Sequence, residues 1–233
     1  MAAILPLVLV PGLLCSARLY APQVAALWSF GQVTVADHRR DDEMAAIAAR
    51  ILADAPPRFA LAGLSMGGYI AFAMLRQAPE RIAKLALLDT SARPDTAEQS
   101  AAREKFIAMA QTGKLNDVVE TLTPRFLHRN RHNDEPLKRI VREMAADTGA
   151  EAFVRQQKAI MGRPDGREDL RRIACPTLVL CGRQDALTPL ALHEEIAGLV
   201  PGAELTVIDD CGHLSTLERP VSVTAALRHW LVG

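Results

Sequence analysis

The ten residues Ala-Leu-Ala-Gly-Leu-Ser-Met-Gly-Gly-Tyr, at positions 60–69, limit the folds open to this chain more than any other stretch. They join a short apolar run at 59–63, a predicted buried strand, to a stretch at 66–77 that is typical of a helix. Gly63, Ser65 and Gly67 form the pattern Gly-x-Ser-x-Gly at this junction. Such a serine occupies a strained tight turn with its hydroxyl above the sheet, and the glycines keep strand and helix from colliding. The pattern therefore predicts that Ser65 is presented as a nucleophile.

Short apolar runs alternate with longer helical stretches along most of the remaining chain. The predicted strands are residues 4–10, 32–36, 59–63, 84–89, 176–181 and 204–208, and the predicted helices are 18–28, 42–53, 66–77, 190–199 and 221–231. Most of the strands are apolar throughout, as expected for strands covered on both faces. Alternation of this kind predicts right-handed crossovers and therefore an α/β fold, with a mostly parallel sheet between helices.

Residues 93–172 interrupt the alternation. This stretch reads as successive helices at 96–111, 115–122, 135–146 and 151–161, without a strand. We therefore predict a core formed by 1–92 and 173–233, and a helical cap, or lid, formed by 93–172. The cap contains a basic run made of Arg125, His128, Arg129, Arg131 and His132. Such a run is either a solvated face or a contact for an anionic substrate.

A serine hydroxyl needs a neighbouring base to remove its proton, and that base needs an acid to orient it. Asp185 follows the predicted strand at 176–181, and His213 follows the predicted strand at 204–208. Because catalytic groups collect at the carboxyl ends of parallel strands, Ser65, Asp185 and His213 are expected to meet at one edge of the sheet.

Several other residues compete for these roles. Asp89 also ends a strand and is the best rival acid. His193 lies inside a helix, where we expect a surface or capping role, and the remaining histidines, His38, His128, His132 and His229, lack the position after a strand. Neither Cys15 nor Cys211 lies in a tight turn between a strand and a helix like that of Ser65, so both are interpreted as structural.

Composition excludes several classes of protein. The chain has 233 residues, of which 49% are hydrophobic and 23% charged, with a formal net charge of +0, so neither nucleic acid nor membrane is an expected partner. The four cysteines lack metal-ligand spacing, so no metal is expected. Reduced thiols and the absence of a convincing export signal favour a cytoplasmic protein, and the oligomeric state is left open.

The sequence resembles the α/β-hydrolase family, particularly its small cap-bearing serine esterases and enol-lactonases. The likeness covers nearly the whole chain and lies in GLSMGG at 63–68, GRQDALTP at 182–189, DDCGH at 209–213 and PGLL at 11–14. It implies an oxyanion hole formed by the backbone N–H groups of Leu13 and Met66. Many members have His-Gly where this chain has Pro11-Gly12, but the donor is a backbone N–H, so the function can survive.

The resemblance also implies the strand order. Members usually begin with two further strands, whereas this chain starts almost at the strand before the oxyanion loop, so we expect about six strands in the family order 4-3-5-6-7-8. The apolar run LPLVLVPGLLC at 5–15 is then a central strand and its loop rather than a signal peptide.

The expected activity is cofactor-free cleavage of a small carboxylic ester or lactone through a Ser-His-Asp triad and an acyl-enzyme. The same triad could serve a carbon–carbon bond hydrolase, a perhydrolase or a lyase, because one fold hosts many reactions. A ligand receptor with weak turnover is an alternative from another class. Candidate pocket residues are Leu14, Arg125, Arg129 and Met144.

Overall fold

The computed structural model describes residues 5–233 and contains one parallel sheet of six strands. The strands are β1 (Leu7–Val10), β2 (Val33–Val35), β3 (Phe59–Leu64), β4 (Ile82–Leu88), β5 (Thr177–Gly182) and β6 (Glu204–Ile208). Their order across the sheet is β2-β1-β3-β4-β5-β6, which confirms the expected fold class and order. The first strand was expected to start at Ile4, which lies outside the described residues.

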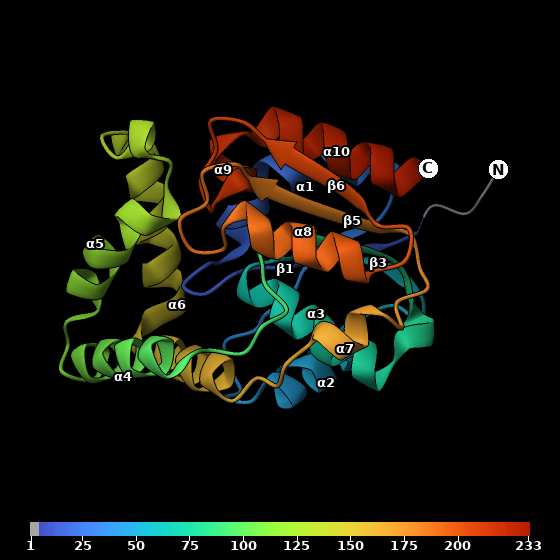
Figure 1. Ribbon diagram of the computed structural model, residues 1–233. Coiled ribbons are helices and arrows are strands. Elements are labelled where there is room, and N and C mark those ends of the chain that lie inside the picture. Colours follow the sequence, from blue (N-terminus) through green and yellow to red (C-terminus); the bar gives the residue numbers. More distant parts are fainter. Residues whose placement is uncertain (1–4) are drawn as a thin grey trace.

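Alternating side chains of the strands feed two separate cores. Leu7 and Leu9 of β1 pack on one face of the sheet, and Val8 and Val10 pack on the other. The helices that cover the first face include α1 (Ala21–Leu27) and α10 (Pro220–Val232), and those that cover the second are α2 (Met44–Asp54), α3 (Met66–Gln77) and α8 (Leu190–Leu199) (Figure 1). Because both faces are covered, the strands can be apolar at every position.

The predicted helix at 18–28 is instead three short elements. They are the 3₁₀ turn η1 (Ala17–Tyr20), α1, and the 3₁₀ turn η2 (Trp28–Phe30). The side chain of Ser16 caps η1, and Pro22 lies in the first turn of α1. Proline lacks the N–H that would continue the preceding turn, so a new helix starts there.

Four helices occupy the chain between β4 and β5. They are α4 (Ala97–Gln111), α5 (Leu115–Phe126), α6 (Glu135–Met161) and the short α7 (Arg167–Leu170). Figure 1 shows α4, α5 and α6, which we call the cap helices, beyond the arrowheads of β5 and β6. The helix α6 breaks at Gly149, where φ is 76°, which agrees with the two helices predicted at 135–146 and 151–161. The boundaries 1–92, 93–172 and 173–233 remain a prediction.

The chain enters and leaves the cap segment at neighbouring points. The N–H of Gly166 donates to the carbonyl oxygen of Ala92 at 2.8 Å. The guanidinium of Arg163 donates twice to the carbonyl oxygen of Arg93, from Nε at 3.2 Å and from Nη2 at 3.0 Å. These bonds fasten the two ends of the segment together.

Residues 5–233 contain neither a candidate membrane span nor a cluster of metal ligands. No helix there is both long and apolar enough to cross a bilayer. The same residues contain no group of three or more His, Cys, Asp or Glu side chains that could hold a metal ion.

Candidate active site

Ser65 lies between β3 and α3 in a backbone conformation that few side chains tolerate, with φ of 56° and ψ of −114°. The neighbouring glycines are required by close packing. A Cβ atom on Gly63 would lie 2.2 Å from the carbonyl oxygen of Gly67, and one on Gly67 would lie 2.0 Å from that of Val10. The Gly-x-Ser-x-Gly pattern therefore forms the strand–turn–helix unit that it predicts.

Ser65, His213 and Asp185 form a continuous chain of hydrogen bonds. His213 Nε2 lies 2.9 Å from Ser65 Oγ, and His213 Nδ1 lies 2.7 Å from Asp185 Oδ2. His213 is 2% exposed and Asp185 is 4% exposed. The structure thus brings together the three residues that the sequence singled out, each from the carboxyl end of a different strand.

The environment of Asp185 keeps this carboxyl group ionised. Its Oδ1 accepts from the N–H groups of Leu187 at 2.8 Å and Thr188 at 3.0 Å, and its Oδ2 accepts from the Thr188 hydroxyl at 2.6 Å. Burial alone would raise the pKa of Asp185, but the charge and hydrogen bond of His213 and the Thr188 bonds hold it below its usual range.

The pKa of His213 is raised above its ordinary value. Burial alone would lower this pKa, but the charge of Asp185 and its hydrogen bond to the ring outweigh burial. The ring also stacks on Phe126 of the cap, with centroids 6.2 Å apart and planes at 18°. His213 is therefore oriented from two sides, by an acid behind it and by an aromatic ring beside it.

The rival residues make other contacts. The carboxylate of Asp89 accepts from the N–H of Gly182 at 2.9 Å and bonds to the hydroxyl of Ser215, whereas the Nδ1 bond of His213 goes to Asp185. The surface role expected for His193 is wrong, because this residue is 0% exposed and its Nε2 accepts from the N–H of Thr90 at 2.9 Å. Burial raises the pKa of Cys15 to about 12, which disfavours a thiolate nucleophile.

The loop after β1 carries the predicted oxyanion donor at Leu13. Among residues 5–233, the N–H groups of Leu13 and Met66 have no hydrogen-bond acceptor, as expected for donors kept for a substrate. The residues on either side of Leu13 are fixed. The N–H of Leu14 donates to Gln156 Oε1 at 3.1 Å, and the carbonyl of Gly12 lies 2.9 Å from His38 Nε2.

His38 and Gln156 were not found by reasoning from the sequence. His38 lies three positions after Val35, the last residue of β2, so the view that it lacks a position after a strand was wrong. It is 2% exposed, and burial lowers its pKa to about 4, so its ring is neutral. Gln156 comes from α6 in the cap, and no local pattern pairs it with a loop 142 positions away.

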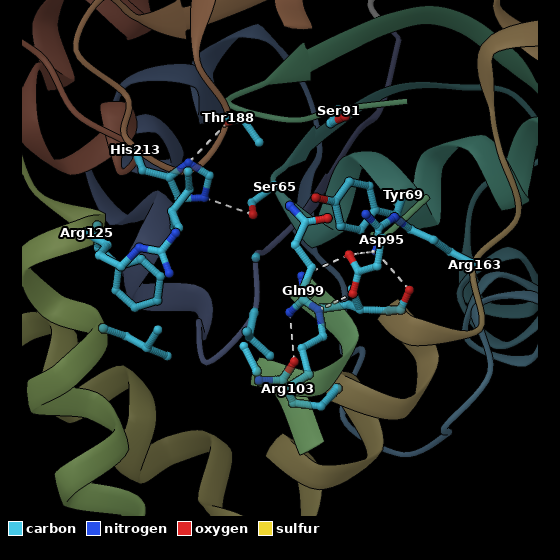
Figure 2. Close-up of a pocket in the computed structure, with 18 of the residues that line it drawn as sticks. Ser65, Tyr69, Ser91, Asp95, Gln99, Arg103, Arg125, Arg163, Thr188 and His213 are labelled. Carbon is cyan, nitrogen blue, oxygen red and sulfur yellow. Dashed lines mark hydrogen bonds and ion pairs between the residues drawn. The ribbon is translucent and has the colours of Figure 1, made fainter. Parts of the chain in front are cut away.

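A cavity of about 380 Å³ lies over Ser65, between the cap helices and the ends of the strands. Its walls include Ser65, Leu13, His213, Thr188, Tyr69, Phe126, Leu122, Phe106, Leu214, Asp95, Gln99, Arg93, Arg103, Arg125 and Arg163. Figure 2 shows His213 and Arg125 on one side of Ser65, with Asp95, Arg103 and Arg163 on the other. Its volume is within the range of small-molecule sites.

Only one of the four candidate pocket residues lines this cavity. Arg125 does, but Leu14, Arg129 and Met144 are absent from the cavity walls formed by residues 5–233. Met144 is 1% exposed and Leu14 is 3% exposed, and both are packed in the core on the α1 side of the sheet. Arg129 is an exposed residue of the 3₁₀ turn η4 (Arg129–Arg131). Methionine commonly fills gaps in hydrophobic cores, as Met144 does here.

A parallel sheet with a serine elbow and an Asp-His pair at its carboxyl edge defines a hydrolase-type α/β protein. The sequence matches the profile described as "Alpha/beta hydrolase family" over residues 7–227, and the chain belongs to that family.

Known proteins of similar sequence and structure agree with this assignment. A solved thermophilic esterase from Thermogutta terrifontis, with malate bound, is 31% identical with a TM-score of 0.90 over 98% of this chain and 89% of that one. The enol-lactonase from Burkholderia xenovorans LB400 is 25% identical with a TM-score of 0.88 over 99% and 93%. A pimeloyl–acyl-carrier-protein methyl ester esterase from Aromatoleum aromaticum is 27% identical over 73% of this chain and 72% of its own.

Proposed function

We propose that this protein is a serine hydrolase that cleaves a small carboxylic ester or lactone through an acyl-enzyme. The observation that carries the proposal is the unbroken series of contacts from Ser65 Oγ to His213 Nε2 and from His213 Nδ1 to Asp185, at 2.9 Å and 2.7 Å, in the wall of a cavity. The names of the three relatives, two esterases and an enol-lactonase, support the same bond type.

The first half of the reaction forms the acyl-enzyme. His213 Nε2 takes the hydroxyl proton of Ser65 as Oγ attacks the carbonyl carbon, and Asp185 stabilises the resulting imidazolium. The carbon–oxygen bond to the leaving alcohol then breaks, and His213 gives its proton to that oxygen. In a lactone the leaving alcohol stays attached to the acyl group.

The second half returns the enzyme to its starting state. A water molecule gives a proton to His213 and attacks the acyl carbon, and the bond to Ser65 Oγ breaks as Oγ takes the proton back. In both halves the N–H groups of Leu13 and Met66 stabilise the negative oxygen, and each such donor typically contributes about 3 kcal/mol. The bonds from Gln156 and His38 to the residues beside Leu13 position this donor.

Replacing Ser65 with alanine tests the proposal. Ser65→Ala removes the attacking oxygen, so the turnover of p-nitrophenyl butyrate is expected to fall by several orders of magnitude. Release of p-nitrophenol over many turnovers should be followed in the wild type, in Ser65→Ala and in Ser222→Ala, which removes an exposed hydroxyl on α10. Wild-type turnover in Ser65→Ala would refute the proposal. A single stoichiometric release in the wild type would instead favour a ligand receptor.

A further inference from the structure

The charges that line the cavity are unbalanced. Four arginines contribute to its walls, Arg93, Arg103, Arg125 and Arg163, against one carboxylate, Asp95. The protein as a whole has a formal net charge of +0, so this excess of positive charge is local. A cavity with walls of one charge sign attracts a ligand of the opposite sign.

Two of the arginines are occupied within the wall itself. Arg103 binds Asp95 through Nε at 2.5 Å and Gln157 Oε1 through Nη1 at 2.8 Å. Arg163 binds the other oxygen of Asp95 through Nη1 at 2.7 Å, and its guanidinium lies 4.2 Å from the centre of the Tyr69 ring. Their donors are committed to protein groups, so they act as structural parts of the wall.

The third arginine is neutralised from outside the cavity. Arg93 places Nε and Nη2 on the two carboxylate oxygens of Glu195 in α8, both at 2.9 Å. This is the fork-to-fork geometry in which arginine binds a carboxylate most strongly. A substrate would have to displace Glu195 in order to use Arg93.

Arg125 differs from the other three. Among residues 5–233, its guanidinium forms no hydrogen bond and no ion pair, and its exposed side chain lines the cavity. All of its donors are therefore available to a ligand. Figure 2 shows it on the His213 side of the cavity, across from Asp95.

The backbone beside Arg125 is fixed relative to the proposed catalytic base. The carbonyl oxygen of Phe126 accepts from the N–H groups of His213 at 3.0 Å and Leu214 at 3.1 Å, and the Phe126 ring stacks on His213. Arg125 is thus next to Phe126, the residue whose carbonyl oxygen binds the loop that carries His213. A ligand bound by Arg125 would be held at a set place relative to the reacting atoms.

We propose that Arg125 binds a carboxylate group carried by the substrate, so that the preferred ester or lactone is an anion. This inference rests on the proposed hydrolase function and narrows its substrate class. A guanidinium matches the two oxygens of a carboxylate and can bind both at once. The rest of the cavity takes the apolar part of the same molecule, between Phe106, Leu122 and Phe126.

Matched pairs of charged and neutral esters test this specificity. One pair is monomethyl adipate and methyl hexanoate, with the charge in the acyl part, and the other is 4-acetoxybutanoate and butyl acetate, with the charge in the alcohol part. Acid release by the wild type, Arg125→Gln, Arg125→Lys and Arg129→Gln gives KM for each ester. Arg129→Gln removes one charge from an exposed turn outside the cavity, so it controls for a change in overall charge.

In at least one pair, we expect the wild type to have the lower KM for the charged ester. The ratio of KM for the charged ester to KM for the neutral one should rise about tenfold in Arg125→Gln. It should rise less in Arg125→Lys, which keeps the charge, and should stay at the wild-type value in Arg129→Gln. A ratio within about twofold of the wild type for both pairs in Arg125→Gln, or an equal change in Arg129→Gln, would overturn the inference.

The proposed hydrolase function can fail separately. If wild-type enzyme hydrolyses the neutral esters through Ser65 but shows no charge effect, only the inference about Arg125 is wrong. If no ester is hydrolysed, calorimetric titration of adipate into the wild type and Arg125→Gln decides the matter. Weaker binding to Arg125→Gln would support the carboxylate site, whereas equal binding or none would overturn it.

Discussion

Four residues of the described chain adopt left-handed backbone angles although none is glycine. They are Leu14 with φ of 58°, Ser65 with 56°, Asp89 with 43° and Asp210 with 49°. Each follows a strand, after β1, β3, β4 and β6 respectively, at the edge of the sheet where the proposed active site lies. Such conformations persist only where the surroundings hold them. For Leu14 the holding group is Gln156, and for Asp89 it includes the N–H of Gly182.

The pH dependence of turnover should report on His213. The base must be neutral to accept the Ser65 proton, so kcat/KM for p-nitrophenyl butyrate should rise with pH as His213 loses its proton. Because Asp185 raises the pKa of His213, the midpoint of this rise in the wild type is expected above 6.5, the ordinary value for histidine.

Replacing the acid should move that midpoint downward. Asp185→Asn removes the charge that raises the pKa of His213 and leaves burial, which lowers it, so the midpoint should shift below that of the wild type. The rate should fall by about 10⁴, because the wrong histidine tautomer is favoured. An unchanged midpoint in a pH–rate profile of Asp185→Asn would show that Asp185 is not the partner of His213.

At the scale of elements, the cap and the histidine loop are joined by a buried carboxylate. Glu218, the last residue of α9 (Ser215–Glu218), is 1% exposed. Its Oε1 accepts from the N–H of Gly212 at 3.0 Å, and its Oε2 accepts from the N–H of His128, after α5, at 2.8 Å. One side chain therefore links the loop that carries His213 to the cap segment that carries Arg125.

Glu218→Gln should weaken this junction. One glutamine atom becomes an NH₂ group that faces a backbone N–H, which leaves a buried donor unsatisfied, so the free energy of unfolding should fall by about 1–3 kcal/mol. Since the same junction positions His213, kcat should fall as well. Urea unfolding and ester turnover measure the two effects. Glu151→Gln, at a side chain 93% exposed, is the control, and equal behaviour of both variants would exclude a role for the junction.

Elements with a strong local signal were predictable from the sequence. The six strands were predicted because short apolar runs alternate with helical periodicity. The break in α6 at Gly149 lies in the gap between the two helices predicted at 135–146 and 151–161. The predicted end of α5 at Leu122 was wrong, because the helix continues through Pro124 to Phe126, which packs into the core. Burial of Phe126 outweighs the hydrogen bond that Pro124 cannot make.

At the scale of the whole molecule, features with a local sequence signal were predictable, whereas contacts between residues distant in the sequence were not. The positions of Ser65, Asp185 and His213 follow from strand ends and a local motif. The contacts of Gln156 with Leu14, Glu218 with His128, and Arg163 with Asp95 join residues that lie 142, 90 and 68 positions apart. They depend on how the cap packs against the sheet, which no local pattern describes. For the same reason only Arg125 among the four pocket candidates reached the cavity.

The buried acid Asp89 should make global stability depend on pH. Burial and the charge of Asp185 raise the pKa of Asp89 to about 8 in the folded protein, against an ordinary value of 3.8. The folded state therefore holds a proton that the unfolded chain has lost, so the stability from this group is complete below pH 3.8 and is lost as pH rises through 8. The slope is at most about 1.4 kcal/mol per pH unit.

Asp89→Asn isolates that contribution. Asparagine resembles the protonated acid but does not titrate. Its amide oxygen can accept from the N–H of Gly182, and the Ser215 hydroxyl, which donates to Asp89, can turn to accept from the amide NH₂. Between pH 6 and pH 9, Asp89→Asn should lose less unfolding free energy than the wild type in urea titrations. Identical losses in the two proteins would mean that Asp89 does not hold a proton in the folded state.

The paired ends of the cap segment have a consequence for how such a protein can change over generations. Because Gly166 bonds to Ala92 and Arg163 to Arg93, the chain between these points leaves the sheet and returns to nearly the same place. Replacing the segment between these bonds with a different one would change the substrate specificity. The strands and the loops that carry Ser65, Asp185 and His213 would keep their sequence. The replacement segment would have to supply two groups. One is an acceptor for the N–H of Leu14 in place of Gln156, and the other is a donor to Glu218 in place of the N–H of His128.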